Sequence, residues 1–380
     1  MNYLLDRYLF GYLPFEVSDE LKKSISSSSM SVVKIADWFC KTQDIHNFFE
    51  NHFTFFSAEI LYFFLFIFTL FHAFRLGGRF IYTWLGIFML VLLQEIVRFW
   101  QPVLDIQWHA QGLLSFCGGR IPISRVLGAQ QVFIYSSYVL IQRMHFSPKI
   151  QSCATAIGAL ILKLPYDFIG THFLWWTLDF NNPLIQEKVY GVPWIVFAFD
   201  VLSTSSFVFG LTLTRKYLVK NSYNWKMFVR EFICVFLSAL NALFFAFCST
   251  LIIYYAGIYT NVSITLIVLI LTSSFVIDVY IADRRNKNPQ ADCSNIYWFD
   301  ELSFVVCIHF IFLMTIIVFY NPIFIISRGF HKPIGPCQEN TFSQLPSLCF
   351  FGSLILFQAA ALSGRNESFN SNVLKKKKKD

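Results

Sequence analysis

Long apolar runs with few charged residues constrain this chain more than any other feature. Nine such runs follow one another along the 380 residues. A helix needs about 20 mostly apolar residues to cross a bilayer, and only helices and closed barrels satisfy their backbone there. The runs lack the alternation typical of barrel strands. The sequence therefore predicts an all-α fold, a polytopic transmembrane helical bundle of about nine spans (eight or nine).

The predicted spans divide the chain into three parts. We expect an N-terminal lumenal or interfacial segment (1–52), a transmembrane helical domain (53–362) and a cytoplasmic polybasic tail (363–380). The spans cover approximately residues 53–74, 80–103, 123–141, 154–178, 192–214, 231–255, 262–281, 302–326 and 345–362. The last span has the weakest pattern. Apolar residues make up 56% of the chain and charged residues 14%, against about 25% in soluble domains, so the lipid bilayer is its expected partner.

The basic residues predict an orientation in the membrane. Loops after the odd-numbered spans carry twelve Lys and Arg residues, and loops after the even-numbered spans carry four. Basic loops stay on the cytoplasmic side. With nine spans, the N-terminus is therefore expected to be lumenal and the C-terminus cytoplasmic.

The C-terminal tail suggests a location. It ends in five lysines, Lys375 to Lys379, and one aspartate. This ending resembles the dilysine retrieval signal of endoplasmic-reticulum membrane proteins, which implies an endoplasmic-reticulum location and coat machinery as a partner. The alternative is a generic basic tail that binds anionic lipid. Because these lysines supply five of the seven net positive charges, the charge does not indicate nucleic-acid binding.

Metal and cofactor signatures are missing from the sequence. The nine cysteines are scattered and form no CxxC pair, which argues against a zinc or redox motif. The sequence has no GxSxG elbow and no glycine-rich phosphate loop. His109 and His172 could ligate a metal together with Asp167 or Asp200, but no metal-binding spacing accompanies them. We therefore expect neither a metal nor a cofactor.

Ionisable residues inside the apolar runs are the main functional pointer, since a charge in hydrocarbon costs at least ~2.5 kcal/mol. With the predicted orientation, eight of them share one depth in the lumenal half. They are Glu95 and Arg98 in the second span, His109 and Arg120 in the following loop, Lys163, Asp167 and His172 in the fourth span, and Asp200 in the fifth. We predict that the three carboxylates converge on one cavity and that the second, fourth and fifth spans are neighbours.

Each of these residues has a structural and a functional interpretation. Lys163 and Asp167 are four residues apart and can form a structural ion pair on one helix face. The functional interpretation makes Asp167, Asp200 and Glu95 candidate catalytic acids or bases. The candidate ligand-binding residues are Arg98, His109, Arg120, Lys163 and His172.

Three functions fit these features. The first is a membrane protein whose lumen-side polar cavity binds a lipid-like or small polar ligand. A lipophilic small molecule is therefore an expected partner. The second is an intramembrane enzyme that modifies a lipid or isoprenoid by acid–base chemistry, in the manner of a hydratase or isomerase. The third is a proton-coupled transporter. The cytoplasmic halves of the spans look apolar apart from Asp278, which argues against transport.

Several short motifs carry a resemblance to a known family. They are WHAQG (108–112), GGRIP (118–122), PYDFIG (165–170), LWW (174–176) and VYGVPW (189–194). Over roughly residues 80–215 the chain resembles an uncharacterised eukaryotic family of multi-pass membrane proteins, a domain of unknown function. The resemblance implies a helical membrane domain and no particular activity. The Gly-Val-Pro-Trp piece is also faintly similar to carotenoid-hydratase membrane enzymes.

Overall fold

The structure is a computed structural model that is mostly helical. It describes residues 30–31, 34–36, 38–101, 106–142, 147–178, 182–219, 227–256, 260–285 and 301–320. Among these residues, six helices are long and apolar enough to cross a membrane. The predicted helical membrane bundle is confirmed in this form; the predicted total of about nine spans is not.

The six long helices follow the predicted runs closely. They are α4 (Phe53–Leu76), α5 (Arg79–Trp100), α8 (Pro148–His172), α9 (Trp194–Leu218), α10 (Phe228–Ala256) and α12 (Glu301–Phe319). A further helix, α11 (Thr260–Arg285), lies where the seventh span is predicted. The ninth span (345–362), the polybasic tail (363–380) and most of the N-terminal segment lie outside the described residues.

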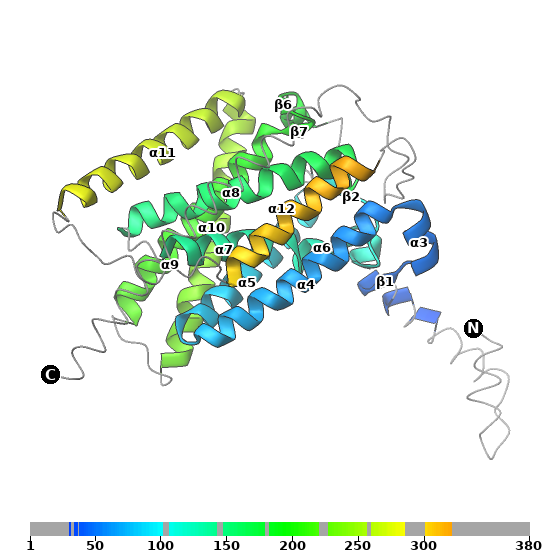
Figure 1. Cartoon of the computed structure of the whole chain (residues 1–380), viewed down its shortest axis with the longest axis horizontal. Coiled ribbons are helices and arrows are strands. Elements are labelled where there is room, and N and C mark those ends of the chain that lie inside the picture. The colour runs from blue at the N-terminus through cyan, green and yellow to red at the C-terminus, as the bar shows by residue number, and fades with distance from the viewer. Residues whose placement is uncertain are drawn as a thin grey trace, which may run out of the picture.

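Helices far apart in the sequence lie side by side in the bundle. Figure 1 shows α12 alongside α4 and α8, and it contacts both. Helix α8 packs on α9, and α9 packs on α10. Two glycines with positive φ, Gly77 and Gly78, make the tight turn between α4 and α5, a conformation that side-chain-bearing residues rarely adopt. These neighbours place the charged residues of α8 and α9 face to face.

The third predicted span is broken. A continuous helix was expected over 123–141, but the chain forms α6 (Ile123–Val126) and α7 (Ala129–Gln142), with a break at Leu127 and Gly128. Helix α7 is buried along nearly its whole length and contacts α4, α5 and α8. Because protein rather than lipid surrounds it, this helix can be short and carry the polar residues Gln130 and Gln131.

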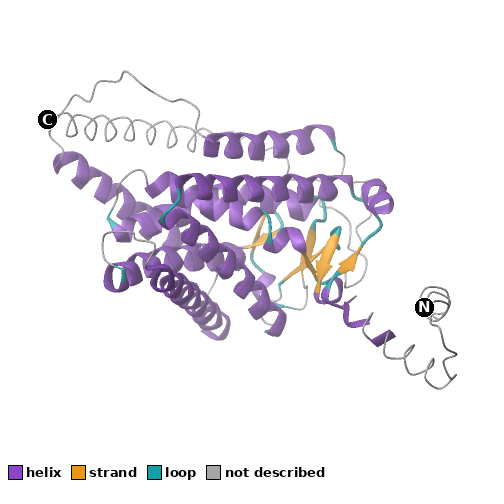
Figure 2. Cartoon of the chain, turned by 90° about the horizontal axis from the view of Figure 1, so that it is seen from below, coloured by secondary structure: helices purple, strands orange, loops and turns teal. Residues whose placement is uncertain are grey.

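Short strands correct the expectation of a purely helical chain. The described residues form β1 (Lys41–Thr42), β2 (Gln107–His109), β3 (Leu114–Phe116), β4 (Ile121–Pro122), β5 (Trp176–Leu178), β6 (Lys188–Val189) and β7 (Val192–Pro193). We call these seven strands the strand cap; Figure 2 shows that they gather on one side of the helices. The pairs β1–β3, β3–β4, β2–β5 and β6–β7 are all antiparallel. The predicted fourth span (154–178) is therefore too long, because its last residues leave the helix and join β5.

The N-terminal segment contributes to the cap where it is described. Strand β1 pairs with β3, and α3 (Ile45–Asn51) follows directly, with Asp44 as its N-cap. Helix α3 leaves Ile45 and Phe49 exposed. An interfacial segment needs exposed apolar side chains of this kind, and the interfacial role of residues 1–52 stays a prediction.

Candidate functional site

The strand cap brings the sequence motifs of this chain together. Strand β2 pairs with β5 so that His109 stands opposite Trp176. The N–H of Ala110 donates to the carbonyl of Trp175 at 2.9 Å, and the N–H of Trp175 donates to the carbonyl of Gly170 at 2.7 Å. These bonds tie WHAQG and LWW to PYDFIG at the end of α8. WHAQG and LWW, about 60 residues apart in the sequence, thus lie together in one layer next to the buried charges of α8 and α9.

Beneath this layer, Lys163 holds two carboxylates. Its Nζ pairs directly with the carboxylate of Asp200 and lies 3.4 Å from Oδ2 of Asp167. Lys163 and Asp167 stand one turn apart on α8, and Asp200 comes from the facing helix α9. Gln130 of α7 donates to Asp200 Oδ1 at 3.4 Å. We call Lys163, Asp167 and Asp200 the Lys163 group; all three side chains are buried.

A second group of charges surrounds Glu95 at the end of α5. Oε1 of Glu95 accepts from Arg98 Nη1 at 2.7 Å and from Arg125 Nε at 3.0 Å. Arg125 also donates through Nη2 to Oε1 of Gln107 at 3.3 Å. The guanidinium of Arg98 lies 5.1 Å from the centre of the Phe199 ring. We call Glu95, Arg98 and Arg125 the Glu95 group.

The two groups are electrostatically coupled and together neutral. Arg125 interacts with Asp167 and Asp200, and Arg98 interacts with Asp200. The Lys163 group carries two acids and one base, whereas the Glu95 group carries one acid and two bases. Buried charges are stable in a bilayer only when they are paired in this way. The three carboxylates therefore lie in one electrostatically coupled region. The predicted common cavity is not found among the described residues, because of the three only Asp200 lines either of the two cavities at the cluster.

The route by which Glu95 joins the cluster differs from the expectation. Helices α8 and α9 pack directly, but α5 packs mainly on α10, α4 and α7. Arg125 of the short helix α6 provides the link, because it bonds Glu95 and acts on both aspartates. The second, fourth and fifth spans were predicted to be mutual neighbours. In the structure only the fourth and fifth (α8 and α9) pack directly, and Arg125 connects Glu95 of the second (α5) to them.

His109 lies next to the cluster and is neutral. Burial, reinforced by the positive charge of Arg125, holds the pKa of His109 well below its usual value. Its ring packs edge-on against Trp176, with ring centres 5.7 Å apart. A neutral imidazole adds no further positive charge to a cluster that already holds three bases.

Asp167 is the least satisfied member of the cluster. It is fully buried, and within the described part of the chain neither of its carboxylate oxygens accepts a hydrogen bond. Its ion pair with Lys163 is longer than the pair that Lys163 makes with Asp200. Nearly all buried polar groups in proteins are hydrogen-bonded. An exception within a membrane bundle marks a group that can take up a proton or a ligand.

Two small cavities touch the cluster. One, of about 10 Å³, is lined by Lys163, Asp200, Gln130 and Thr204. The other, of about 30 Å³, is lined at its polar end by Arg98 and Gln107. These volumes hold about one and two water molecules, respectively. The cluster therefore has room for water or a small polar group, and not for a whole lipid.

Two candidate ligand-binding residues stand against aromatic rings instead. The guanidinium of Arg120 lies 5.1 Å from the centre of the Phe99 ring. His172 ends α8 and packs edge-on against Phe173. The structure thus groups Glu95, Arg98, His109, Lys163, Asp167 and Asp200 from the predicted set, and places Arg120 and His172 at aromatic contacts.

Several buried polar residues lie outside the set predicted from the sequence. Arg125 and Gln130 belong to the cluster, and both sit near the start of the third predicted span at the depth of the others. Glu59 of α4 is also buried; its carboxylate accepts from the N–H of Leu113 at 2.8 Å and the hydroxyl of Ser124 at 2.7 Å. A charged or strongly polar residue within an apolar run was the available signal in each case.

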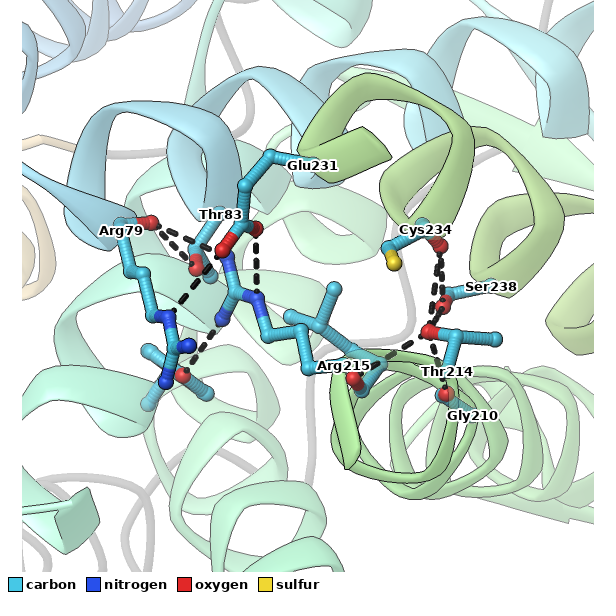
Figure 3. A network of polar contacts seen from close by, with 10 residues as sticks. Arg79, Thr83, Gly210, Thr214, Arg215, Glu231, Cys234 and Ser238 are labelled. Carbon is cyan, nitrogen blue, oxygen red and sulfur yellow. Dashed lines mark hydrogen bonds and ion pairs between the residues drawn. The ribbon is translucent and has the colours of Figure 1, made fainter. Parts of the chain in front are cut away.

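A second buried ion network lies at the opposite end of the bundle and corrects the expectation that this half is apolar. Figure 3 shows Glu231 of α10 between two arginines. It accepts from Arg79 Nε of α5 at 3.1 Å and from Arg215 Nε of α9 at 2.9 Å. Arg215 also donates to the carbonyl of Arg79 at 3.1 Å and to the hydroxyl of Tyr138 at 3.5 Å. This network joins α5, α7, α9 and α10.

Metal binding receives no support from the part of the chain that the structure describes. There, no three side chains of His, Cys, Asp and Glu lie together in a way that would hold a metal ion.

Comparison with known proteins gave one result. The profile of a family described as a domain of unknown function (DUF7802) matches residues 1–351. No curated protein and no solved structure matches the chain.

Proposed function

Because the chain belongs to the DUF7802 family, whose description assigns no activity, we propose a function from the geometry of its buried charges. In this proposal the protein is a multi-pass membrane protein of the endoplasmic reticulum. Its Lys163 group is an acid–base site that exchanges a proton with a small polar ligand or with the polar end of a lipid-like one. The C-terminus is cytoplasmic, and the strand cap faces the lumen.

The state of Asp167 carries this proposal. Lys163 is committed to Asp200, so Asp167 is a second carboxylate that shares one base and accepts no hydrogen bond among the described residues. A proton on Asp167 removes the surplus negative charge of the Lys163 group. A cationic or proton-donating ligand group in the neighbouring cavity does the same. Proton and ligand occupancy at this site are therefore linked.

The test is a deletion followed by untargeted lipid and metabolite profiling. Wild-type protein should restore the profile of the deletion strain. Asp167→Asn should reach wild-type abundance and location yet fail to restore the profile, because an amide cannot exchange the proton. The matched control is Glu301→Gln, the same chemical change on α12 at a partly exposed surface pair with Arg75. If Asp167→Asn restores the profile as fully as Glu301→Gln, the acid–base proposal fails.

Proton-coupled transport is a second candidate, favoured by the Glu231 network. A transport path needs polar residues in both halves of the bundle, and buried Glu231 supplies them opposite the Lys163 group. Helix α7 runs between the two, from Gln130 at Asp200 to Tyr138 at Arg215. Proton flux into dye-loaded liposomes that Asp167→Asn abolishes would favour transport. Liposomes that hold a pH gradient equally well with and without the protein would exclude it.

A further inference from the structure

The 30 Å³ cavity beside α5 has a polar end and apolar walls. Arg98 and Gln107 form the polar end, and Ile195, Val196 and Phe199 form the walls. The lining residues come from α5, from the segment that leads into β2, and from α9, with Thr250 of α10 closing one side. A charged group at the end of an apolar cavity is the arrangement expected for an amphipathic ligand.

The polar end has unused capacity for an anion. One carboxylate, Glu95, serves both Arg98 and Arg125, so the Glu95 group by itself carries one more positive than negative charge, and only the more distant Lys163 group balances it. Asp200 acts on Arg98 more weakly than Glu95 does. Gln107 uses its Oε1 to accept from Arg125, but within the described residues its buried Nε2 has no hydrogen-bond partner. A guanidinium that shares its carboxylate with a second arginine and an unpaired amide donor thus line the same small space.

The backbone of α9 adds to this preference for a negative group. Ile195 and Val196, in the first turn of α9, form part of the wall. The N-cap, Pro193, makes no side-chain capping bond. The N-terminal turn of a helix carries partial positive charge and free N–H groups.

Size and surroundings limit the kind of anion. Room for about two water-sized groups fits the two oxygens of a carboxylate and is too small for a phospholipid headgroup. Helices α5 and α10, which contribute to the lining, also carry exposed large apolar side chains elsewhere on their surface, Ile96 and Trp100 on α5 and Ile252 on α10. Exposed apolar faces on helices of this length are expected to contact the acyl chains of a bilayer.

We propose that this cavity binds the carboxylate of a single-chain lipid, such as a long-chain fatty acid, at Arg98 and Gln107. The acyl chain leaves the cavity along its apolar walls, Ile195, Val196 and Phe199. This inference rests on the proposed function, since it names the class of ligand that reaches the acid–base site. Arg98 interacts with both Glu95 and Asp200, so a bound carboxylate changes the charge balance of the Lys163 group.

The experiment uses the full chain in nanodiscs of neutral phosphatidylcholine. Oleate and oleyl alcohol, which differ in the headgroup, are titrated in parallel while the thermal midpoint and the displacement of a photoreactive fatty acid are measured. Oleate should stabilise the wild type and oleyl alcohol should not. Arg98→Gln removes the charge and Val196→Phe fills the cavity; each should weaken oleate binding at least tenfold. Arg75→Gln, an exposed arginine at the far end, is the matched control and should bind oleate like the wild type.

Several outcomes would overturn the inference. Equal stabilisation by oleate and oleyl alcohol would show that no carboxylate is recognised. Unchanged oleate affinity in Val196→Phe would place the ligand elsewhere, and this variant decides the question if Arg98→Gln fails to fold. Acetate that competes as well as oleate would show a soluble anion site. Asp167→Asn leaves the cavity walls intact and should still bind oleate. If Asp167→Asn binds oleate and also restores the lipid and metabolite profile of the deletion strain, the acid–base function is refuted but the lipid site is kept.

Discussion

Replacing Glu231 by Gln should destabilise the protein by about 3 kcal/mol. Glu231 has no exposed side-chain surface and is the counter-charge of Arg79 and Arg215. Removing one partner of a buried ion pair costs about 3–5 kcal/mol, because the remaining charge stays buried and unpaired. The Arg215 side chain is 9% exposed and cannot reach water easily. The Arg79 side chain is 28% exposed and can turn outward to water. The expected loss of unfolding free energy is therefore at the lower end of the ~3–5 kcal/mol range.

The measurement is reversible unfolding of the purified protein in bicelles, with a surface pair as control. Arg75 pairs with Glu301, but the arginine side chain is 74% exposed, and surface pairs contribute about 0–1 kcal/mol. Arg75→Gln should therefore lower the free energy of unfolding by less than about 1 kcal/mol. In a double-mutant cycle, Glu231→Gln and Arg215→Gln should be non-additive. A Glu231→Gln loss no larger than that of Arg75→Gln, or strict additivity in the cycle, would refute the reasoning.

Three further predictions test other parts of the structure. Gly170→Ala should cost about 1–3 kcal/mol, because an added Cβ would meet the buried Trp176 ring; a thermal midpoint equal to that of the wild type would contradict this packing. His109 has a pKa well below 6.5 when folded, so only the unfolded state gains its proton as the pH falls below 6.5. Stability is therefore lost as the pH falls below 6.5, and His109→Gln should make the pH dependence less steep; an equally steep slope in the variant would show that other groups cause it. Changing Lys377 and Lys378 to Ser should release the protein from the endoplasmic reticulum towards the cell surface, as seen by microscopy, whereas an unchanged location would leave only a lipid-binding tail.

The sequence alone was sufficient for a helical membrane bundle and for placing the three carboxylates at one level along its helices. Hydrophobic length decides whether a helix can cross a bilayer, and that length is read directly from residues such as 53–74 and 231–255. Depth follows from position along a span, since each residue advances a helix by about 1.5 Å. For this reason Glu95, Asp167 and Asp200 could be assigned to one level before their neighbours were known.

Which charges meet was decided only by the tertiary structure. Pairing depends on how each helix is rotated and which helices adjoin, and neither is encoded in hydrophobic length. Lys163 and Asp167 were a predictable pair because they share a helix face, but Lys163 also pairs with Asp200 on another helix, which the sequence could not show. Arg125 bridges the groups only because the third span breaks after α6. The sequence pattern does not reveal such a break, because the surrounding protein, rather than lipid, can satisfy the hydrogen bonds of the interrupted backbone.

The strand cap likewise depends on long-range contacts. Strands of two or three residues carry no period that a sequence can reveal, and each forms only because a partner strand lies beside it. His109 meets Trp176 through one such pairing. Local hydrophobicity thus determined the helices and the level of the buried charges, whereas the packing of distant segments determined which partner each charge has.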